Sequence, residues 1–196
     1  MKKYIFVSDY FKHQTVGGAE FTTDAIMCHG VKIGVPIVGI NCTSLNLDLL
    51  KSASKEDYHF IVCNFKSLED ELKIYMCKNL SYSIIEYDYK LCEYRSFEIH
   101  ELVEGQPCDC VERPYGKLNT AFYAYAEKVW FMSENQKNSI LSKTNLLKDE
   151  KCEVLSSVFD SGDLRFIKSI SDNEKNENYL ILNSPSPIKG TDNCIA

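Results

Sequence analysis

Short apolar runs alternate with segments of helical periodicity along most of the chain. Runs of strand length lie at residues 4–8, 34–41, 58–64, 82–87, 128–132 and 152–158. Between them, apolar residues recur every three or four positions, which predicts helices near 19–28, 44–53, 68–76, 118–126 and 134–142. The third run, YHFIVCN, is almost continuously apolar, which is typical of a strand covered on both faces.

This alternation predicts an α/β fold, a Rossmann-like doubly wound parallel sheet with helices on both faces, because right-handed crossovers join successive strands. Ligands bind such sheets at the carboxyl ends of the strands. The loops after residues 8, 41, 64, 87 and 132 should therefore form the functional edge. Two capping boxes, Ser67 with Asp70 and Ser133 with Gln136, predict helix starts after the third and fifth strands.

Two stretches break the pattern. Residues 88–116 lack clear periodicity and contain three cysteines, two prolines and many charges. Residues 169–178, SISDNEKNEN, are polar and are interpreted as a linker, so that residues 1–168 form the first domain. The apolar run YLILN at 179–183 then starts a new element.

The composition of the chain argues against some classes of binding partner. The net charge is −6, which argues against nucleic acid because phosphate binding needs a basic face. We expect no transmembrane segment, since no run approaches the length of a membrane helix, and the short run after Met1 lacks the features of a signal peptide. A cytoplasmic protein with reduced thiols is the expectation for the nine cysteines.

The irregular stretch holds a set of residues that zinc prefers. Cys92, His100, Cys108 and Cys110 form the pattern C-x7-H-x7-C-x-C. Three thiols and an imidazole suit a tetrahedral metal, but the spacing matches no common zinc module. Free thiols or a fortuitous disulfide are the alternatives. A structural metal would stabilise a loop too irregular to order itself.

Two glycines, Gly17 and Gly18, separate the first strand from its helix. One interpretation is a tight turn with glycines at positive φ. The other is a phosphate site, because bare backbone at a helix N-terminus lets an anion reach the N–H groups. The pair is neither the G-x-G-x-x-G fingerprint nor part of a Walker A motif.

Four segments in order along the chain resemble one family. They are GGAE at 17–20, VWFMSENQKNSIL at 129–141, CEVLSSVFD at 152–160 and YLILNSPSPIKGTDNCIA at 179–196. Together they are similar to GT-B glycosyltransferases of the family 4-like group. The likeness covers nearly the whole chain, and the order and spacing of these short motifs are more specific than any one of them.

The resemblance implies an enzyme that transfers a sugar from a nucleotide-sugar donor to a sugar or glycan acceptor across a cleft between two Rossmann-like domains. The N-terminal domain of such enzymes mainly binds the acceptor. Gly17 and Gly18 would lie against the donor diphosphate, and Lys189 of the K-G motif would pair with the same phosphates. No cofactor is required, because these groups stabilise the leaving diphosphate.

Under this interpretation residues 179–196 are the truncated first strand and loop of the second domain. The acidic motif that contacts the donor sugar is missing, so we expect a fragment that is inactive alone. A homodimer through the uncovered interdomain face is a further expectation. The alternative is a non-catalytic Rossmann-like binding module, with or without a structural metal in residues 88–116.

The loop after the fourth strand supplies the candidate catalytic residues, Asp88 and Glu86. They are two positions apart, so both side chains point the same way if the strand continues. They could hold sugar hydroxyls or act as a base, with Asp88 the stronger candidate. The alternative is a solvated strand end with a salt bridge to Lys90 or Arg95.

Overall fold

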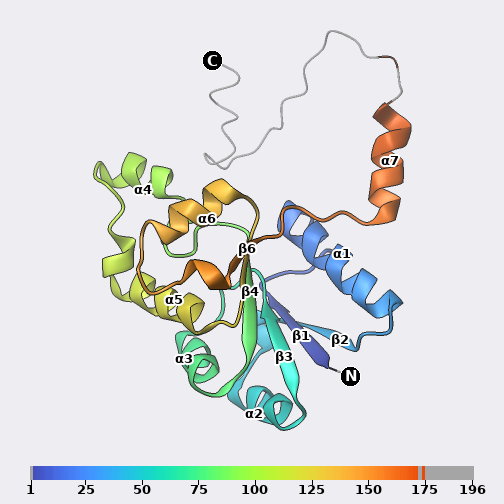
Figure 1. Ribbon diagram of the computed structural model, residues 1–196, viewed down its shortest axis with the longest axis horizontal. Coiled ribbons are helices and arrows are strands. Elements are labelled where there is room, and N and C mark those ends of the chain that lie inside the picture. The colour runs from blue at the N-terminus through green and yellow to red at the C-terminus, as the bar shows by residue number, and fades with distance from the viewer. Residues whose placement is uncertain (1, 172–173, 175–196) are drawn as a thin grey trace. The chain divides into compact units, whose positions relative to one another are not determined.

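A six-stranded sheet organises the first part of the chain (Figure 1). The computed structural model describes residues 2–171 and 174. Residues up to Asp160 form one compact unit, and a second unit begins at Ser161 with helix α7, Ser161–Ser171. On α7, Leu164, Ile167 and Ile170 follow one another at intervals of three residues.

All strand pairs in the sheet are parallel, in the order β2-β1-β3-β4-β5-β6. The strands are β1 (Lys3–Ser8), β2 (Ile37–Asn41), β3 (Tyr58–Val62), β4 (Tyr82–Glu86), β5 (Val129–Phe131) and β6 (Cys152–Val154). The register places Phe6 opposite Gly39 on one side and Ile61 on the other. The predicted α/β fold with a doubly wound parallel sheet is therefore confirmed.

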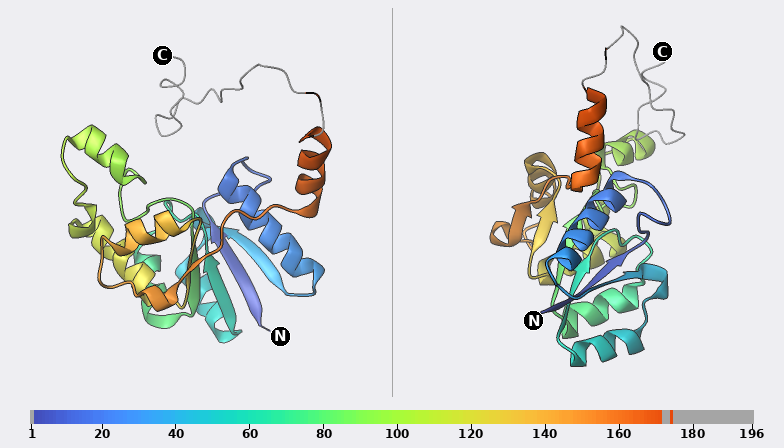
Figure 2. Two further views of the ribbon diagram at one scale, coloured as in Figure 1. Left: turned by 45° about the horizontal axis from the view of Figure 1, so that its top comes forward. Right: turned by 90° about the vertical axis from the view of Figure 1, so that its right-hand side faces the viewer.

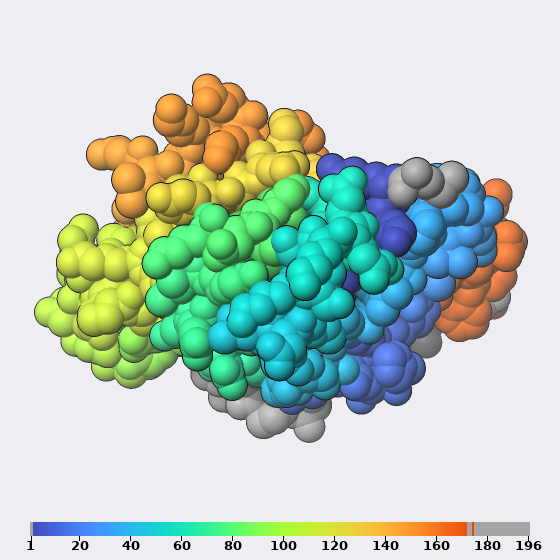
Figure 3. All heavy atoms as spheres, turned by 90° about the horizontal axis from the view of Figure 1, so that it is seen from below, coloured from blue at the N-terminus to red at the C-terminus, as the bar shows by residue number. Residues whose placement is uncertain are grey.

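Helices cover both faces of this sheet, as the crossover rule requires (Figure 1, Figure 2). The helices of this unit are α1 (Gly18–Lys32), α2 (Leu47–Lys55), α3 (Asp70–Asn79), α4 (Phe97–Glu104), α5 (Pro114–Tyr125) and α6 (Glu134–Leu141). Side chains of α1 pack on one face with Phe6 and Ile85. The larger core on the opposite face includes side chains of α2, α3, α5 and α6. Figure 3 shows α2 and α3 next to each other at the surface on that side.

Aromatic packing dominates the larger core. Tyr82 of β4 stacks on Phe122 of α5 with a ring separation of 4.7 Å, and Phe65 contacts the edges of Phe122 and Tyr123. All four rings are buried. The Tyr82 hydroxyl donates a hydrogen bond to the Phe122 carbonyl at 2.6 Å, which satisfies its polar end inside the core.

Two local predictions are wrong. Residues 88–116 are not wholly irregular, because they contain α4 and a 3-10 turn at Cys110–Glu112. The Ser67 side chain does not cap α3, which begins at Asp70 after Glu69. The backbone N–H groups of Lys66 and Ser67 instead donate to the Asp9 carboxylate, each at 2.9 Å. The helix start predicted at Ser133 is confirmed, since its side chain accepts from the Gln136 N–H at 3.1 Å, but Gln136 Oε1 accepts from the Met132 N–H rather than from the Ser133 N–H of a full capping box.

Other predictions concern the C-terminal end. The predicted linker at 169–178 begins inside α7. The predicted second domain at 179–196, with Lys189, lies outside the described residues. Within residues 2–171 and 174, no helix is long and apolar enough to cross a membrane. The cysteines of the described residues are all free thiols.

Candidate functional site

The carboxyl ends of the parallel strands share one edge of the sheet. The chain passes from β1 to β2 on one side and later to β3 on the other, which makes the end of β1 a topological switch point. Asp9, just after β1, connects the ends of β1 and β3. Its N–H donates to the Asn64 carbonyl at 2.6 Å, and its carboxylate accepts from the backbone N–H groups of Lys66 and Ser67. Asp9 is therefore a buried structural group.

The glycine pair opens α1 without a left-handed turn. Gly17 is the N-cap with φ −161° and ψ 167°, and Gly18 is the first helical residue. Among the described glycines only Gly34 and Gly105 have positive φ, so the tight-turn interpretation is wrong. A Cβ at Gly18 would meet nothing within 4 Å, whereas one at Gly17 would lie 2.4 Å from Glu20 Oε2. The space around the Gly18 backbone is therefore open, whereas the Glu20 carboxylate lies beside Gly17.

The first turns of α1 are bonded to two other segments of the edge. Thr23 Oγ1 and Tyr87 Oη, just after β4, are 2.8 Å apart. The Val158 N–H donates to Thr22 Oγ1 at 3.2 Å. Both threonines are buried. Side-chain hydroxyls therefore hold the start of α1 against the ends of β4 and β6.

A cluster of two acids and two bases lies just beyond β4. Lys90 Nζ donates to Glu86 Oε1 at 3.0 Å and to Asp88 Oδ2 at 3.2 Å. Arg95 also donates to Asp88 Oδ2, from Nε at 3.1 Å and from Nη2. The side chains of Glu86 and Lys90 are fully buried, whereas 27% of the Asp88 side chain and 33% of the Arg95 side chain are exposed.

The two carboxyl groups have opposite electrostatics. Burial raises the pKa of Glu86 to about 7, although Lys90 opposes the shift. Partial burial would raise the pKa of Asp88, but the charges of Lys90 and Arg95 outweigh it and lower that pKa. Asp88 is therefore an ionised, solvent-facing carboxylate, and Glu86 is a buried group that holds Lys90.

The two predicted catalytic residues, Glu86 and Asp88, differ in how far they are exposed. β4 ends at Glu86, and the Glu86 carboxylate accepts the Asp88 N–H at 2.6 Å as the chain turns. Both carboxylates still reach the same Lys90 Nζ, but only the Asp88 side chain is partly exposed and open to a ligand. The ion pairs of Asp88 with Lys90 and Arg95 match the alternative interpretation of this loop. A role for Asp88 in binding a substrate stays a prediction.

The helix after β5 also contacts this loop. Gln136 Nε2 donates to the Asp88 carbonyl at 2.6 Å, and Gln136 Oε1 accepts from the Met132 N–H at 2.7 Å. Gln136 is 5% exposed. Its amide therefore fixes the backbone of Asp88 relative to β5 and α6.

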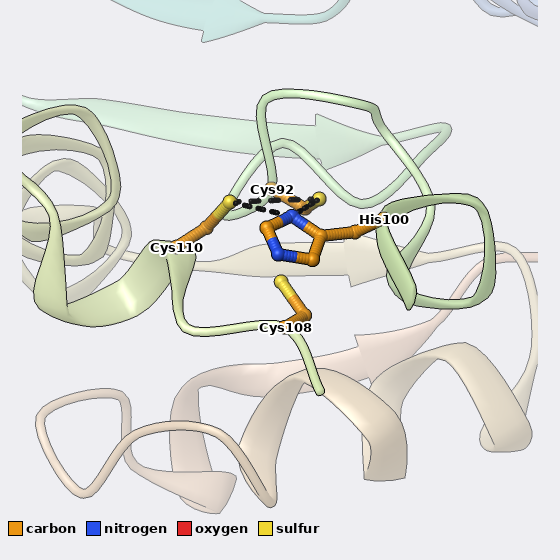
Figure 4. Close-up of side chains that lie close together, drawn as sticks. All are labelled: Cys92, His100, Cys108 and Cys110. Carbon is orange, nitrogen blue, oxygen red and sulfur yellow. Dashed lines mark hydrogen bonds between the residues drawn. The ribbon is translucent and has the colours of Figure 1, made fainter. Parts of the chain in front are cut away.

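The four candidate metal ligands come together within the first unit. One ligand atom from each of Cys92, His100, Cys108 and Cys110 lies within 4.8 Å of every other (Figure 4). Cys92 follows the acidic cluster, His100 lies on α4, and Cys110 opens the 3-10 turn before α5. The predicted set is thus one cluster in space, at the base of the loop that carries Asp88.

Sequence reasoning missed several residues that shape this edge. Lys90 and Arg95 were considered only as surface partners, and the structure makes Lys90 a fully buried bridge between two carboxylates. The apolar face predicted for the helix at 19–28 comprises Phe21, Ala25 and Cys28, whereas the structure buries Thr22, Thr23 and Ala25 and exposes Cys28, so the sequence pattern did not point to the two threonines. A hollow of about 420 Å³ lies elsewhere, between α5 and the loop after α6, and includes none of the predicted site residues.

Comparison with protein-family models finds no match, and comparison with curated proteins finds no similar sequence.

Proposed function

We propose that this chain is the acceptor-side domain of a glycosyltransferase that uses a nucleotide-sugar donor. One observation carries the proposal. Two of the segments that resemble the GT-B family contact this edge of the sheet: residues 152–160 through the bond from the Val158 N–H to Thr22, and residues 129–141 through the bond from Gln136 to the Asp88 carbonyl. Thr22 lies on the helix that the third segment, GGAE, opens, and Thr23 of that helix bonds to Tyr87 beside Asp88. That edge is where doubly wound folds bind their ligands.

In this proposal Asp88 is the carboxylate that meets a sugar hydroxyl. Its lowered pKa keeps it a hydrogen-bond acceptor at neutral pH. Arg95, Lys90 and Gln136 hold it in place. Glu86 acts as a positioning residue, because its side chain is fully buried.

The open backbone at Gly18 is the proposed contact for a donor phosphate. Backbone N–H groups at a helix N-terminus favour anions. Lys189 is proposed as a second phosphate ligand on the basis of the resemblance alone, and it lies outside the described residues. The Glu20 carboxylate lies beside Gly17, where its charge would repel a phosphate, so the proposed contact is on the side of Gly18.

The test is turnover of a panel of nucleotide sugars by the natural gene product that contains this chain. We expect release of a nucleoside diphosphate that depends on an added glycan acceptor. Asp88→Asn should lower kcat/KM by at least tenfold, as should Lys189→Ala. Glu56→Gln is the matched control, since Glu56 pairs with Lys3 at the opposite edge of the sheet.

Two results would change the conclusion. Acceptor binding without diphosphate release would favour the non-catalytic binding module. Turnover that Asp88→Asn leaves unchanged would remove Asp88 from the site.

A further inference from the structure

We propose that Cys92, His100, Cys108 and Cys110 bind one zinc ion, and that this site braces the loop that carries Asp88 and Arg95. The inference is independent of the proposed transferase activity. It rests on the distances between the ligand atoms, on their burial and on the way the chain supports them.

The distances match a tetrahedral centre. The sulfurs of Cys92 and Cys110 are 3.7 Å apart, and they lie 3.9 Å and 3.3 Å from His100 Nδ1. Zinc bonds of ordinary length imply separations of about 3.8 Å between two sulfurs and about 3.6 Å between sulfur and nitrogen. A disulfide would need its sulfurs about 2.0 Å apart. The spacing of Cys92, Cys110 and His100 is therefore that of a shared ion, and the Cys108 sulfur lies within 4.8 Å of each of their ligand atoms.

Burial favours a metal over free thiols. Cys92, His100 and Cys110 are fully buried, and Cys108 is 9% exposed. Figure 4 shows the three sulfurs grouped around the imidazole: Cys92 comes from one segment, Cys108 and Cys110 from a second, and His100 from α4. Four polar groups gathered in an apolar setting gain little from one another, because thiols are weak hydrogen-bond partners. Zinc would convert them into strong ligands.

The second nitrogen of His100 points to the same conclusion. Within the part of the chain that the structure describes, His100 Nε2 is buried and has no hydrogen-bond partner. Its nearest acid is Asp109, whose Oδ1 is 3.6 Å away and accepts from Arg113 Nη2 at 2.8 Å. When Nδ1 binds a metal, Nε2 carries the proton and is directed toward this carboxylate. The 3.6 Å separation is too long for a hydrogen bond, so the bond to a carboxylate that commonly orients a metal-bound histidine would form when the metal binds.

The backbone presents each ligand. The Cys92 carbonyl accepts from the Arg95 N–H at 3.0 Å, which closes a turn beneath the ion pair with Asp88. Ser96 caps α4 through Ile99, and this helix carries His100. Beyond the cluster, a Cβ at Gly116 would lie 1.9 Å from the Cys110 carbonyl oxygen, so α5 packs directly against the ligand turn.

The donor set indicates a structural role and zinc as the ion. Three thiolates and one imidazole complete a tetrahedron, which leaves no open position for water or substrate. Soft sulfur ligands select zinc over magnesium or calcium. The site would add a bond between segments that core side chains such as Leu91 and Phe97 already hold, whereas Leu102 and Val103 of α4 are exposed.

The test begins with the protein purified under reducing conditions without a metal-affinity tag. Metal analysis should give about one zinc per chain. Replacement by Co²⁺ should give the intense visible absorption of a tetrahedral site and a thiolate charge-transfer band. Cys110→Ser should weaken zinc affinity at least a hundredfold. The control is Cys152→Ser, whose hydroxyl can keep the bond from Cys152 Sγ to the Lys148 carbonyl.

A second measurement covers a variant that fails to fold. A strong chelator added to the wild-type chain should lower its Tm, and zinc should restore it, because a ligand bound only by the folded state stabilises it. After denaturation in chelator, all nine cysteines should react with a thiol reagent. Absence of zinc, a cobalt spectrum without thiolate bands, equal affinity in Cys110→Ser, or two unreactive thiols would overturn the proposal.

Discussion

Lys90 Nζ lies 3.0 Å from Glu86 Oε1, and both side chains are completely buried. Lys90 also reaches Asp88, so one buried ammonium joins a buried carboxylate to a partly exposed one. The pair occupies the end of β4, where the strand gives way to the loop of the candidate site. Its protonation state therefore links the stability of the fold to the geometry of Asp88.

Glu86 should make stability depend on pH. Burial raises its pKa from 4.5 to about 7, so between these values the folded chain holds a proton that the unfolded chain has lost. The free energy of unfolding should therefore fall as pH rises through this window, by an amount on the order of 1–3 kcal/mol. Urea denaturation from pH 4.5 to 7.5 measures it.

Glu86→Gln is the matched variant for this prediction. It should remove the decline with pH, while Lys90 keeps Asp88 as its partner. Asp88 does not produce the same effect, because its lowered pKa makes its stabilisation disappear at lower pH. Identical pH profiles for the wild type and Glu86→Gln would contradict the assignment.

Loss of the buried cation should cost more than loss of the whole pair. Lys90→Met leaves Glu86 without its counter-charge, and we expect a loss of about 3 kcal/mol in the free energy of unfolding at pH 8. The double variant Lys90→Met with Glu86→Gln should recover part of this loss. Additive effects in the double-mutant cycle would show that the two groups are not coupled.

A glycine substitution tests the packing beneath the metal cluster. Gly116→Ala places a methyl group against the Cys110 carbonyl oxygen, at an ideal distance of 1.9 Å. Because that atom is backbone, the turn has to move, and we expect a loss of about 2 kcal/mol with weakened zinc binding. Thermal melts and zinc competition measure the two effects.

Gly18→Ala is the control for that change. Nothing lies within 4 Å of a Cβ at this position, and alanine suits a helix better than glycine. Its stability should equal or slightly exceed that of the wild type. If both variants lose the same stability, close packing of α5 on Cys110 is not the cause.

Removal of Arg95 tests how Asp88 is held. Arg95 has a left-handed backbone, with φ 58°, and its guanidinium donates to Asp88 Oδ2. Arg95→Gly should relieve the backbone strain while releasing the carboxylate, so stability should change by less than about 1 kcal/mol. Glycan binding, measured by calorimetry, should weaken. Unchanged binding would separate Arg95 from the site.

The strand–helix alternation was sufficient to predict the fold because the buried strands are mostly apolar, with His59, Ser83 and Glu86 as the polar exceptions in β3 and β4. Residues 58–62 and 82–86 lie centrally in the sheet, and β4 is buried at every position. The parallel order then follows from right-handed crossovers. The α4 helix was not predicted: it is short and faces the core mainly through Phe97 and His100, while Leu102 and Val103 are exposed.

Tertiary contacts account for the other differences. The Ser67 cap was wrong because Asp9, far away in the sequence, binds the N–H groups at that turn. The strand expected to carry both Glu86 and Asp88 ends at Glu86, and the two carboxylates meet through Lys90 instead. For the metal cluster, the sequence provides suitable ligand residues, but their spacing matches no common zinc module. Only the fold brings α4 and the 3-10 turn together around Cys92.

The most direct test of the central claim is a titration of the ¹⁵N-labelled chain with mono- and oligosaccharides, followed by amide chemical shifts. The account predicts that at least one sugar shifts the amides of Gly18, Asp88 and Gln136 together, and that Asp88→Asn weakens this response at least tenfold. Shifts confined to the opposite edge of the sheet, around Glu56, or a response that Asp88→Asn leaves unchanged, would contradict it.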